Sequence, residues 1–245
     1  MIYCMSDIYG DYERYKKMLV KIRFSDKDIL YVLGNSIDGG DSMKILLDMM
    51  MRENVYPVIG EHEYAALRCL GKLMEASDMS DLSSLDPDTM QKLSDWVRIG
   101  GQKTIVQFRA LSDEQKEMVV DYLCDFALYE EVSAGGKDFI LVHAGLSNFA
   151  PEKDLDDYDI YELITGSLDY SKVYFEDKYL VTGHTPTRKI HEEDNPLLEP
   201  AVNGAPCGHD KIFIKNNHIA INCGDDIGGR LGAIRLDDMA EFYVD

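Results

Sequence analysis

The chain has 245 residues, 45% of them hydrophobic, and a formal net charge of −20 at pH 7. This length suits one sizeable domain or a domain with a large insertion, and no apolar run approaches the roughly 18 residues that a membrane helix requires. The negative charge argues against nucleic-acid backbones and anionic membranes as partners. It also repels anionic substrates unless a metal ion or an arginine cluster inverts the local field.

The N-terminal stretch and the cysteines predict a cytoplasmic protein. The opening stretch, MIYCMSDIYG, has no basic start followed by an apolar core, so it does not resemble a secretion signal. The five cysteines are odd in number, scattered and without a C-x-x-C pair. Neither a disulfide framework nor a zinc knuckle is therefore expected, and a reducing compartment fits best.

The first 65 residues alternate strand and helix patterns. The predicted elements are strands at 2–6, 28–34 and 55–60 and helices at 11–22, 43–54 and from about 63. Successive β-α-β units imply right-handed crossovers and a parallel sheet, whose ligands bind beyond the carboxyl ends of the strands. Asp7, Asn35 and Glu61 each follow such an end, so we expect these side chains to share a site.

The rest of the chain predicts a helical insertion and a second sheet. Residues from about 76 to 127 are polar with helical spacing and include the only tryptophan, Trp96. Strand patterns follow in KDFILVHAG and KYLVTGHTP, and the tail alternates short strands with Asn-Asn and Gly-Gly turns, as an antiparallel sheet would. The expected architecture is α/β: one domain over 1–245, built as a two-sheet sandwich flanked by helices.

Five short segments stand in order along the chain: SDIYG, GNSIDGG, GEHE, VHAG and GHTPT. Together with WVRIGGQKT and the closing IGGRLGAIRLDD, they resemble the calcineurin-like metallophosphoesterases over essentially the whole chain. The likeness is strongest to the serine/threonine phosphatase branch and its bacterial diadenosine-tetraphosphatase-like members. In that branch the segments read D-x-H-G, G-D-x-x-D-R-G, G-N-H-E, H-A-G and G-H-T.

The resemblance implies a four-layer α/β/β/α sandwich and a two-metal reaction. Two ions about 3.5–4 Å apart share a hydroxide and clamp the phosphate. A histidine beyond the ions protonates the leaving group, with a carboxylate orienting it, and arginines hold the remaining phosphate oxygens. Transferred to this sequence, the proton-handling residues are His62 and Asp38, and the metal ligands would come from Asp7, Asn35, Glu61, His143 and His184.

Four positions depart from the motifs. Tyr9 stands where the family has a histidine, and a neutral phenol is a poor ligand for Mn²⁺ or Zn²⁺, although ferric iron could hold its phenolate. Asn35 stands at the bridging aspartate, and an amide oxygen cannot hold two dications as a carboxylate does. Glu61 replaces a metal-binding asparagine and Gly39 a phosphate-binding arginine, and no arginine lies between His143 and His184.

Two interpretations of Tyr9 and Glu61 remain open from the sequence. Tyr9 fills the volume of a lost metal site while Glu61 pairs with a protonated histidine, or the two residues belong to a rebuilt metal site. The charge lost at Asn35 is regained at Glu61, which favours one ion held by Glu61, His143 and His184. We therefore expect at most one divalent ion (Mn, Zn or Fe) and doubt a two-metal site.

These departures predict a pseudophosphatase with a binding or regulatory role. The alternative is an active phosphoric-ester hydrolase with a mononuclear or altered metal site, of the protein phosphatase or dinucleoside-polyphosphate hydrolase type. Loss of the bridging carboxylate alone would cost several kcal/mol of transition-state stabilisation. The expected partner is a phosphorylated substrate or a protein. We expect binding neither to nucleic acid nor to a membrane.

Overall fold

A computed structural model describes residues 1–75, 85–194, 210–224 and 227–245. The first of its two five-stranded sheets has the order β10-β9-β1-β2-β3. Strands β1, β2 and β3 run parallel, as expected from the β-α-β pattern, while β9 and β10 are antiparallel additions from the end of the chain. The strands are β1 (Ile2–Met5), β2 (Ile29–Leu33), β3 (Val55–Val58), β9 (Leu231–Arg235) and β10 (Ala240–Val244).

The second sheet has the order β4-β5-β6-β8-β7. Strands β5, β6 and β8 are parallel, and antiparallel strands β4 and β7 close the two edges. Their bounds are β4 (Tyr129–Ala134), β5 (Lys137–Val142), β6 (Lys178–Thr182), β7 (Phe213–Lys215) and β8 (His218–Ala220). The tail is therefore mixed: β7 and β8 form the hairpin expected at Asn216–Asn217, but β8 pairs with β6 in parallel.

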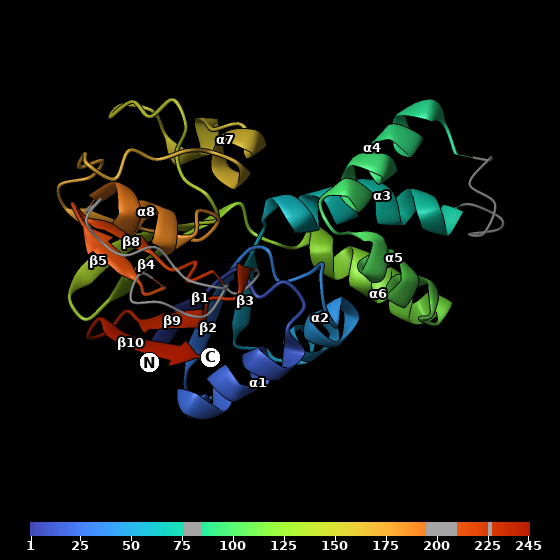
Figure 1. Ribbon diagram of the computed structural model, residues 1–245, viewed down its shortest axis with the longest axis horizontal. Helices are drawn as coiled ribbons and strands as arrows, with labels where there is room; N and C mark the ends of the chain where they lie inside the picture. Colours follow the sequence, from blue (N-terminus) through green and yellow to red (C-terminus); the bar gives the residue numbers. More distant parts are fainter. Residues whose placement is uncertain (76–84, 195–209, 225–226) are drawn as a thin grey trace.

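The two sheets pack face to face, with helices outside them (Figure 1). Buried side chains from both sheets, such as Leu33 and Val58 on one side and Leu141 and Val181 on the other, share one hydrophobic cluster. Helices α1 (Tyr12–Lys21) and α2 (Ser42–Met50) connect the parallel strands of the first sheet, and α7 (Ile160–Ile164) and α8 (Thr187–Asp194) lie beside the second. This is the α/β/β/α sandwich that the sequence predicted.

Helix α1 shows why the local sequence folds as it does. Asp11 caps the N-terminus by accepting a hydrogen bond from the backbone N–H of Arg14. The buried face carries Tyr15, Met18 and Leu19, at the three-to-four-residue spacing of one helix side. Its burial against the sheet fixes the loop that precedes it, which carries Asp7 and Tyr9.

A helical arm extends to one side of the sheets (Figure 1). It consists of α3 (Glu61–Glu75), α4 (Pro87–Arg98), α5 (Gln102–Arg109) and α6 (Asp113–Cys124). The last three fall inside the expected insertion at about 76–127, although 76–84 lie outside the described residues. Trp96 and Phe108 are fully buried in the arm, and in the part of the chain described here no helix is long and apolar enough to cross a bilayer.

Candidate functional site

The loops that follow the parallel strands of both sheets meet at one edge of the sandwich. The side chains expected to form a site lie on them: Asp7 after β1, Asn35 after β2, Glu61 after β3, His143 after β5 and His184 after β6. Backbone hydrogen bonds tie the first two loops together. The Asp7 N–H donates to the Gly34 carbonyl at 3.0 Å, and the Tyr9 N–H donates to the Asn35 carbonyl at 2.9 Å.

The backbone of these loops is strained. Ten non-glycine residues in the described chain have positive φ, and five of them are at this site: Asp7, Tyr9, Asn35, Asp38 and His184. Side chains with a Cβ occupy this region at an energetic cost, which the surrounding structure must offset. Strain gathered at one edge of the sheets makes that edge the candidate functional site.

Glu61 connects the two sheets through both of its oxygens. Oε2 lies 2.6 Å from Nε2 of His143, and Oε1 lies 3.0 Å from Nδ1 of His184. The second approach lacks hydrogen-bond geometry, so Nδ1 of His184 is a buried nitrogen without a hydrogen-bond partner. One ligand atom from each of the three residues lies within 4.8 Å of the other two.

The electrostatics of this cluster depend on the pairing of Glu61 with His143. Burial disfavours the charged imidazole, but the Glu61 carboxylate outweighs burial and raises the pKa of His143 to about 9. Burial likewise favours the neutral acid at Glu61, but the charge of His143 and its hydrogen bond hold the Glu61 pKa well below its usual range. Without a metal ion, the two side chains therefore form an ion pair at neutral pH.

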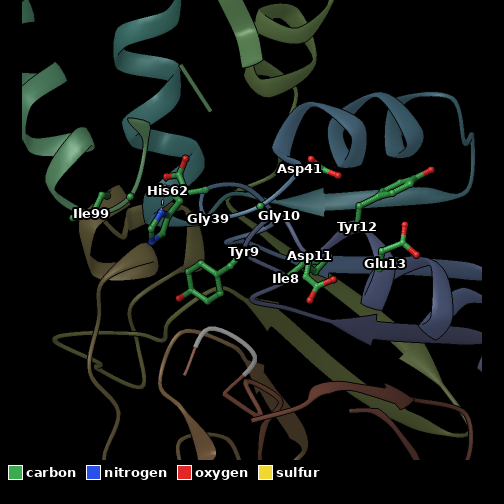
Figure 2. A pocket seen from close by; sticks show the side chains of 13 residues that line it. Ile8, Tyr9, Gly10, Asp11, Tyr12, Glu13, Gly39, Asp41, His62 and Ile99 are labelled. Carbon is green, nitrogen blue, oxygen red and sulfur yellow. Dashed lines mark hydrogen bonds and ion pairs between the residues drawn. The ribbon is translucent and has the colours of Figure 1, made fainter. Parts of the chain in front are cut away.

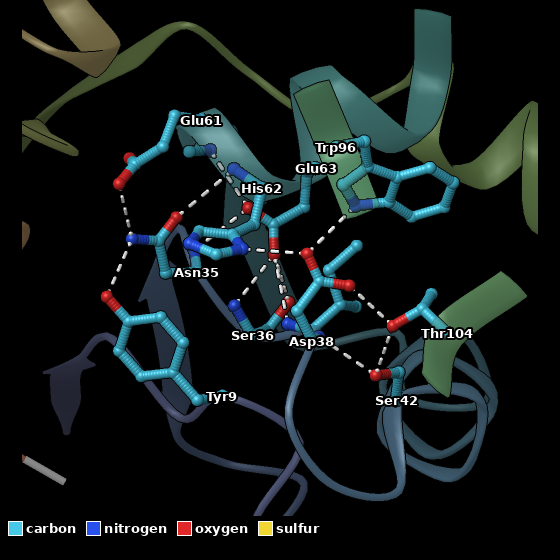
Figure 3. A network of polar contacts seen from close by, with 12 residues as sticks. Tyr9, Asn35, Ser36, Asp38, Ser42, Glu61, His62, Glu63, Trp96 and Thr104 are labelled. Carbon is cyan, nitrogen blue, oxygen red and sulfur yellow. Dashed lines mark hydrogen bonds and ion pairs between the residues drawn. The ribbon is translucent and has the colours of Figure 1, made fainter. Parts of the chain in front are cut away.

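The Asn35 amide lies among three oxygens, of which Figure 3 shows those of Tyr9 and Glu61. Its Nδ2 lies 3.1 Å from Oδ1 of Asp7, 3.2 Å from the hydroxyl of Tyr9 and 3.1 Å from Oε1 of Glu61. On the opposite side, its Oδ1 accepts from the backbone N–H of His62 at 3.4 Å. Three acceptors on one side and a donor on the other fix the orientation of the amide.

The described residues offer a possible site for one metal ion at Glu61, His143 and His184. One carboxylate and two imidazoles are a donor set that Mn, Zn or Fe accepts, and Nδ1 of His184, one of these donors, has no hydrogen-bond partner. Around Asn35, an N–H₂ group points at the oxygens that would otherwise surround a second cation, and the Tyr9 hydroxyl also donates to Asp7 at 3.3 Å. A second ion would have to displace these donors and then rely on a neutral amide as its bridge.

The expected dyad is intact beside this centre. Nδ1 of His62 lies 2.7 Å from Oδ2 of Asp38, and both side chains are buried. Burial disfavours the charged form of His62, but the hydrogen bond and charge of Asp38 raise its pKa. Two residues of the helical arm also donate to the Asp38 carboxylate: Nε1 of Trp96 at 2.9 Å and the hydroxyl of Thr104 at 2.5 Å. The helical arm therefore fixes the dyad (Figure 3).

Glu63 is a further site residue, and the motifs alone gave it no role. It is fully buried, and its carboxylate accepts from the backbone N–H groups of Asn35 and Ser36 at 2.8 and 2.7 Å and of Gly60 at 3.1 Å. Through these backbone N–H groups it holds the loop after β2 in place. The sequence signal for this role was its position two residues after Glu61 in GEHE.

A pocket of about 620 Å³ opens between the loops after β1 and β2 (Figure 2). Its wall includes His62, Tyr9 and Gly39, and none of its lining residues is an arginine or lysine. The lining consists of Ile8, Tyr9, Gly10, Asp11, Tyr12, Glu13, Asp38, Gly39, Gly40, Asp41, His62, Ile99 and Gly100. The wall itself thus offers no arginine or lysine to a phosphate, in agreement with the glycine at position 39.

The chain is similar in sequence to known proteins. The sequence profile of the family described as Calcineurin-like phosphoesterase matches residues 1–224. A symmetrical bis(5'-nucleosyl)-tetraphosphatase from Nitrosospira multiformis is 24% identical, over 100% of this chain and 95% of that protein. Another of the same description, from Wigglesworthia glossinidia brevipalpis, is 32% identical over 44% of this chain, and the alignment spans only 43% of that relative.

Two solved structures share the fold. A proposed diadenosine tetraphosphatase superposes with a TM-score of 0.62 at 17% identity, covering 99% of this chain and 92% of that one. A metallophosphoesterase from Sphaerobacter thermophilus gives a TM-score of 0.52 at 15% identity, covering 100% and 88%. At these identities the likeness establishes the arrangement of the sheets and helices, not the chemistry.

Proposed function

Because the chain belongs to the calcineurin-like phosphoesterase family, we propose that it binds phosphoesters in the cleft beside His62 with at most one divalent ion, and that its hydrolytic activity is impaired. The observation that carries the proposal is the amide of Asn35. Its Nδ2 faces oxygens of Asp7, Tyr9 and Glu61 at 3.1 to 3.2 Å, where a cation would need ligands. We infer a binding or regulatory role, because the chain keeps a pocket beside His62 but has an amide in place of the carboxylate that would bridge two ions.

Glu61, His143 and His184 would hold the single ion. When bound there, a divalent ion supplies Lewis-acid polarisation of a phosphoryl oxygen. The chain itself contributes the ligands and excludes water around His143, whose side chain is fully buried. Asp7 remains outside this set, because its carboxylate is already engaged by the Asn35 amide and by the backbone N–H of His184 at 2.9 Å.

A second candidate, a slow hydrolase with one metal ion, is favoured by the intact dyad. Asp38 holds His62 Nδ1 at 2.7 Å and leaves Nε2 without a hydrogen-bond partner among the described residues, in a ring that lines the pocket (Figure 2). A histidine oriented in this way can donate a proton to a departing alkoxide. In this case, loss of the bridging carboxylate slows hydrolysis but does not abolish it.

Two classes of phosphoester are candidate ligands. Proteins described as symmetrical bis(5'-nucleosyl)-tetraphosphatases are similar to this chain, so a dinucleoside polyphosphate is one candidate. A phosphorylated protein is the other, from the motif resemblance to serine/threonine phosphatases. In either case we place the protein in the cytoplasm, where both substrates and free thiols occur.

Hydrolysis assays with the full chain and Mn²⁺ at neutral pH test the proposal. p-Nitrophenyl phosphate, a phosphopeptide and diadenosine tetraphosphate cover the substrate classes, and the matched control is His62→Ala. We expect turnover of all three substrates to stay near the background that the His62→Ala variant shows. Turnover well above that background, abolished by His62→Ala, would instead establish the single-metal hydrolase.

A further inference from the structure

Helix α5 brings a lysine to the loop that has lost its phosphate-binding arginine. Lys103 is exposed, lies in the first turn of α5, and donates through Nζ to the Gly39 carbonyl at 2.5 Å. Two more residues of the same helix anchor this loop. Thr104 donates to Asp38, and Gln107 donates to the Gly40 carbonyl at 2.7 Å.

Position 39 itself cannot readily carry the missing cation. Gly39 has φ of +87°, a conformation that side chains with a Cβ rarely adopt. A Cβ built there would lie 2.8 Å from the backbone carbonyl oxygen of Tyr9. An arginine at this position would therefore strain the two loops that form the pocket, and a cation must come from another element.

Lys103 also differs from the other cations that contact these loops. Arg14 pairs with Asp11 at 3.6 Å, and Lys44 pairs with Asp41 at 2.7 Å. A carboxylate therefore already neutralises each of these two cations. The contact of Lys103 is to a neutral backbone carbonyl, and within the described ranges it forms no ion pair. Its charge is thus available to an anion at the mouth of the pocket beside His62.

We propose that Lys103 binds the phosphate group of the phosphoester, in place of the arginine that the family's motif carries at position 39. This assignment rests on the proposed function, because it names the cation of the same cleft. Exchange of the Gly39 carbonyl for a phosphate oxygen replaces a neutral acceptor by a charged one and strengthens the hydrogen bond. An ammonium serves as a point charge and needs no bidentate geometry, so a lysine on a neighbouring helix suffices.

Calorimetric titration of inorganic phosphate into the Mn²⁺-loaded full chain tests the assignment. Lys103→Ala is expected to weaken the affinity about tenfold and Lys103→Glu more, while Lys103→Arg retains most of it. The matched control is Lys92→Ala, which removes the same charge from α4, where Lys92 pairs with Asp88 of its own helix. We expect the control to bind phosphate as the natural chain does.

The outcomes separate the two proposals. Equal phosphate affinity of the natural chain and the Lys103→Ala variant overturns the role of Lys103 and leaves the proposed function standing. An equal loss in Lys92→Ala also overturns it, because the effect would then be one of net charge. Absence of phosphate binding by the natural chain, in a preparation that binds Mn²⁺ and loses it on His143→Ala, overturns both proposals.

Discussion

The candidate site has a metal half around Glu61 and a dyad half around Asp38, and the two halves satisfy their carboxylates in different ways. In the metal half, Asp7 and Glu61 face the Asn35 amide, and Glu61 also pairs with His143. In the dyad half, Asp38 accepts from a histidine, a tryptophan and a threonine, all within 2.9 Å. The dyad residues His62 and Asp38 agree with the motifs of the family and only the neighbouring Gly39 departs, whereas the metal half departs from them at three positions.

The two halves are held in place by different hydrogen bonds. The loop after β2 is held by Glu63, which accepts from three of its backbone N–H groups, and by the backbone ladder to the loop after β1. Because no metal ion is needed for these bonds, the residues of the metal half can change while the loops keep their shape. The dyad half has additional support from the helical arm, through the Trp96 and Thr104 contacts to Asp38.

The largest expected effect comes from restoring the metal half. In the triple variant Tyr9→His, Asn35→Asp and Glu61→Asn, we expect a second ion to bind at least about a hundredfold more tightly than in the natural chain, because a charged bridge replaces the amide. Metal titration with elemental analysis measures this. Asn35→Asp alone should not gain the second ion, since ligands of one site act as a unit and Tyr9 still blocks the position.

A triple variant that still binds no more than one ion would show that the cleft differs from the family in more than these three side chains. The comparison between the halves would then lose its basis, because the departure would not be confined to the metal half.

The next effect concerns the dyad half. Asp38→Ala removes the acceptor of three buried donors, on His62, Trp96 and Thr104, and we expect it to destabilise the chain by about 3 kcal/mol. Urea unfolding followed by circular dichroism measures the loss. The control is Asp41→Ala, an exposed residue paired with Lys44, which should cost less than about 1 kcal/mol.

The pH dependence of stability tests the ion pair of the metal half. The pKa of His143 is raised from 6.5 to about 9, so its contribution is complete below 6.5 and lost as the pH rises through 9. The Glu61 pKa is lowered from 4.5, so its contribution is complete above 4.5 and lost in stronger acid. The pair therefore stabilises the fold most between these limits.

With chelator present, we expect the free energy of unfolding to fall by on the order of 1–3 kcal/mol between pH 7.5 and 10. The Glu61→Gln variant should lack this part of the decrease, because a neutral amide does not raise the His143 pKa. Identical pH profiles for the natural chain and the variant would mean that the pair does not form.

The smallest effect compares two glycines. Gly39→Ala should cost about 1–2 kcal/mol, because it combines positive φ with a Cβ 2.8 Å from the Tyr9 carbonyl oxygen. Gly71→Ala in α3 is the control: a Cβ there meets nothing within 4 Å, and alanine favours a helix by up to about 1 kcal/mol. Thermal unfolding of both variants measures the difference, and equal melting temperatures would remove the steric argument at position 39.

Much of this fold could be predicted from the sequence. The period of the apolar residues identified β1, β2, β3 and the helices between them, and the motif order identified the sandwich. Strand β4 and helix α8 were missed, because their polar, half-exposed sequences carry no clear period. The pairing of β8 with β6 was missed as well, because a parallel partner distant in sequence leaves no local signal.

The candidate site was predicted as a set of residues and not as a network. The strand ends placed Asp7, Asn35 and Glu61 together, and the structure brings them within hydrogen-bond distance of one another through the Asn35 amide. That the amide donates to both carboxylates, and that Lys103 approaches Gly39 from the helical arm, depends on tertiary packing. Neither contact follows from spacing along the chain.

The number of metal ions bound by the natural chain tests the central claim most directly. Elemental analysis of the purified protein after saturation with Mn²⁺ and removal of free metal gives this number, and anomalous scattering from crystals locates the ions. We predict no more than one ion per chain, at Glu61, His143 and His184. Two ions per chain with Asn35 between them would contradict the claim that an amide has replaced the bridge of the metal half.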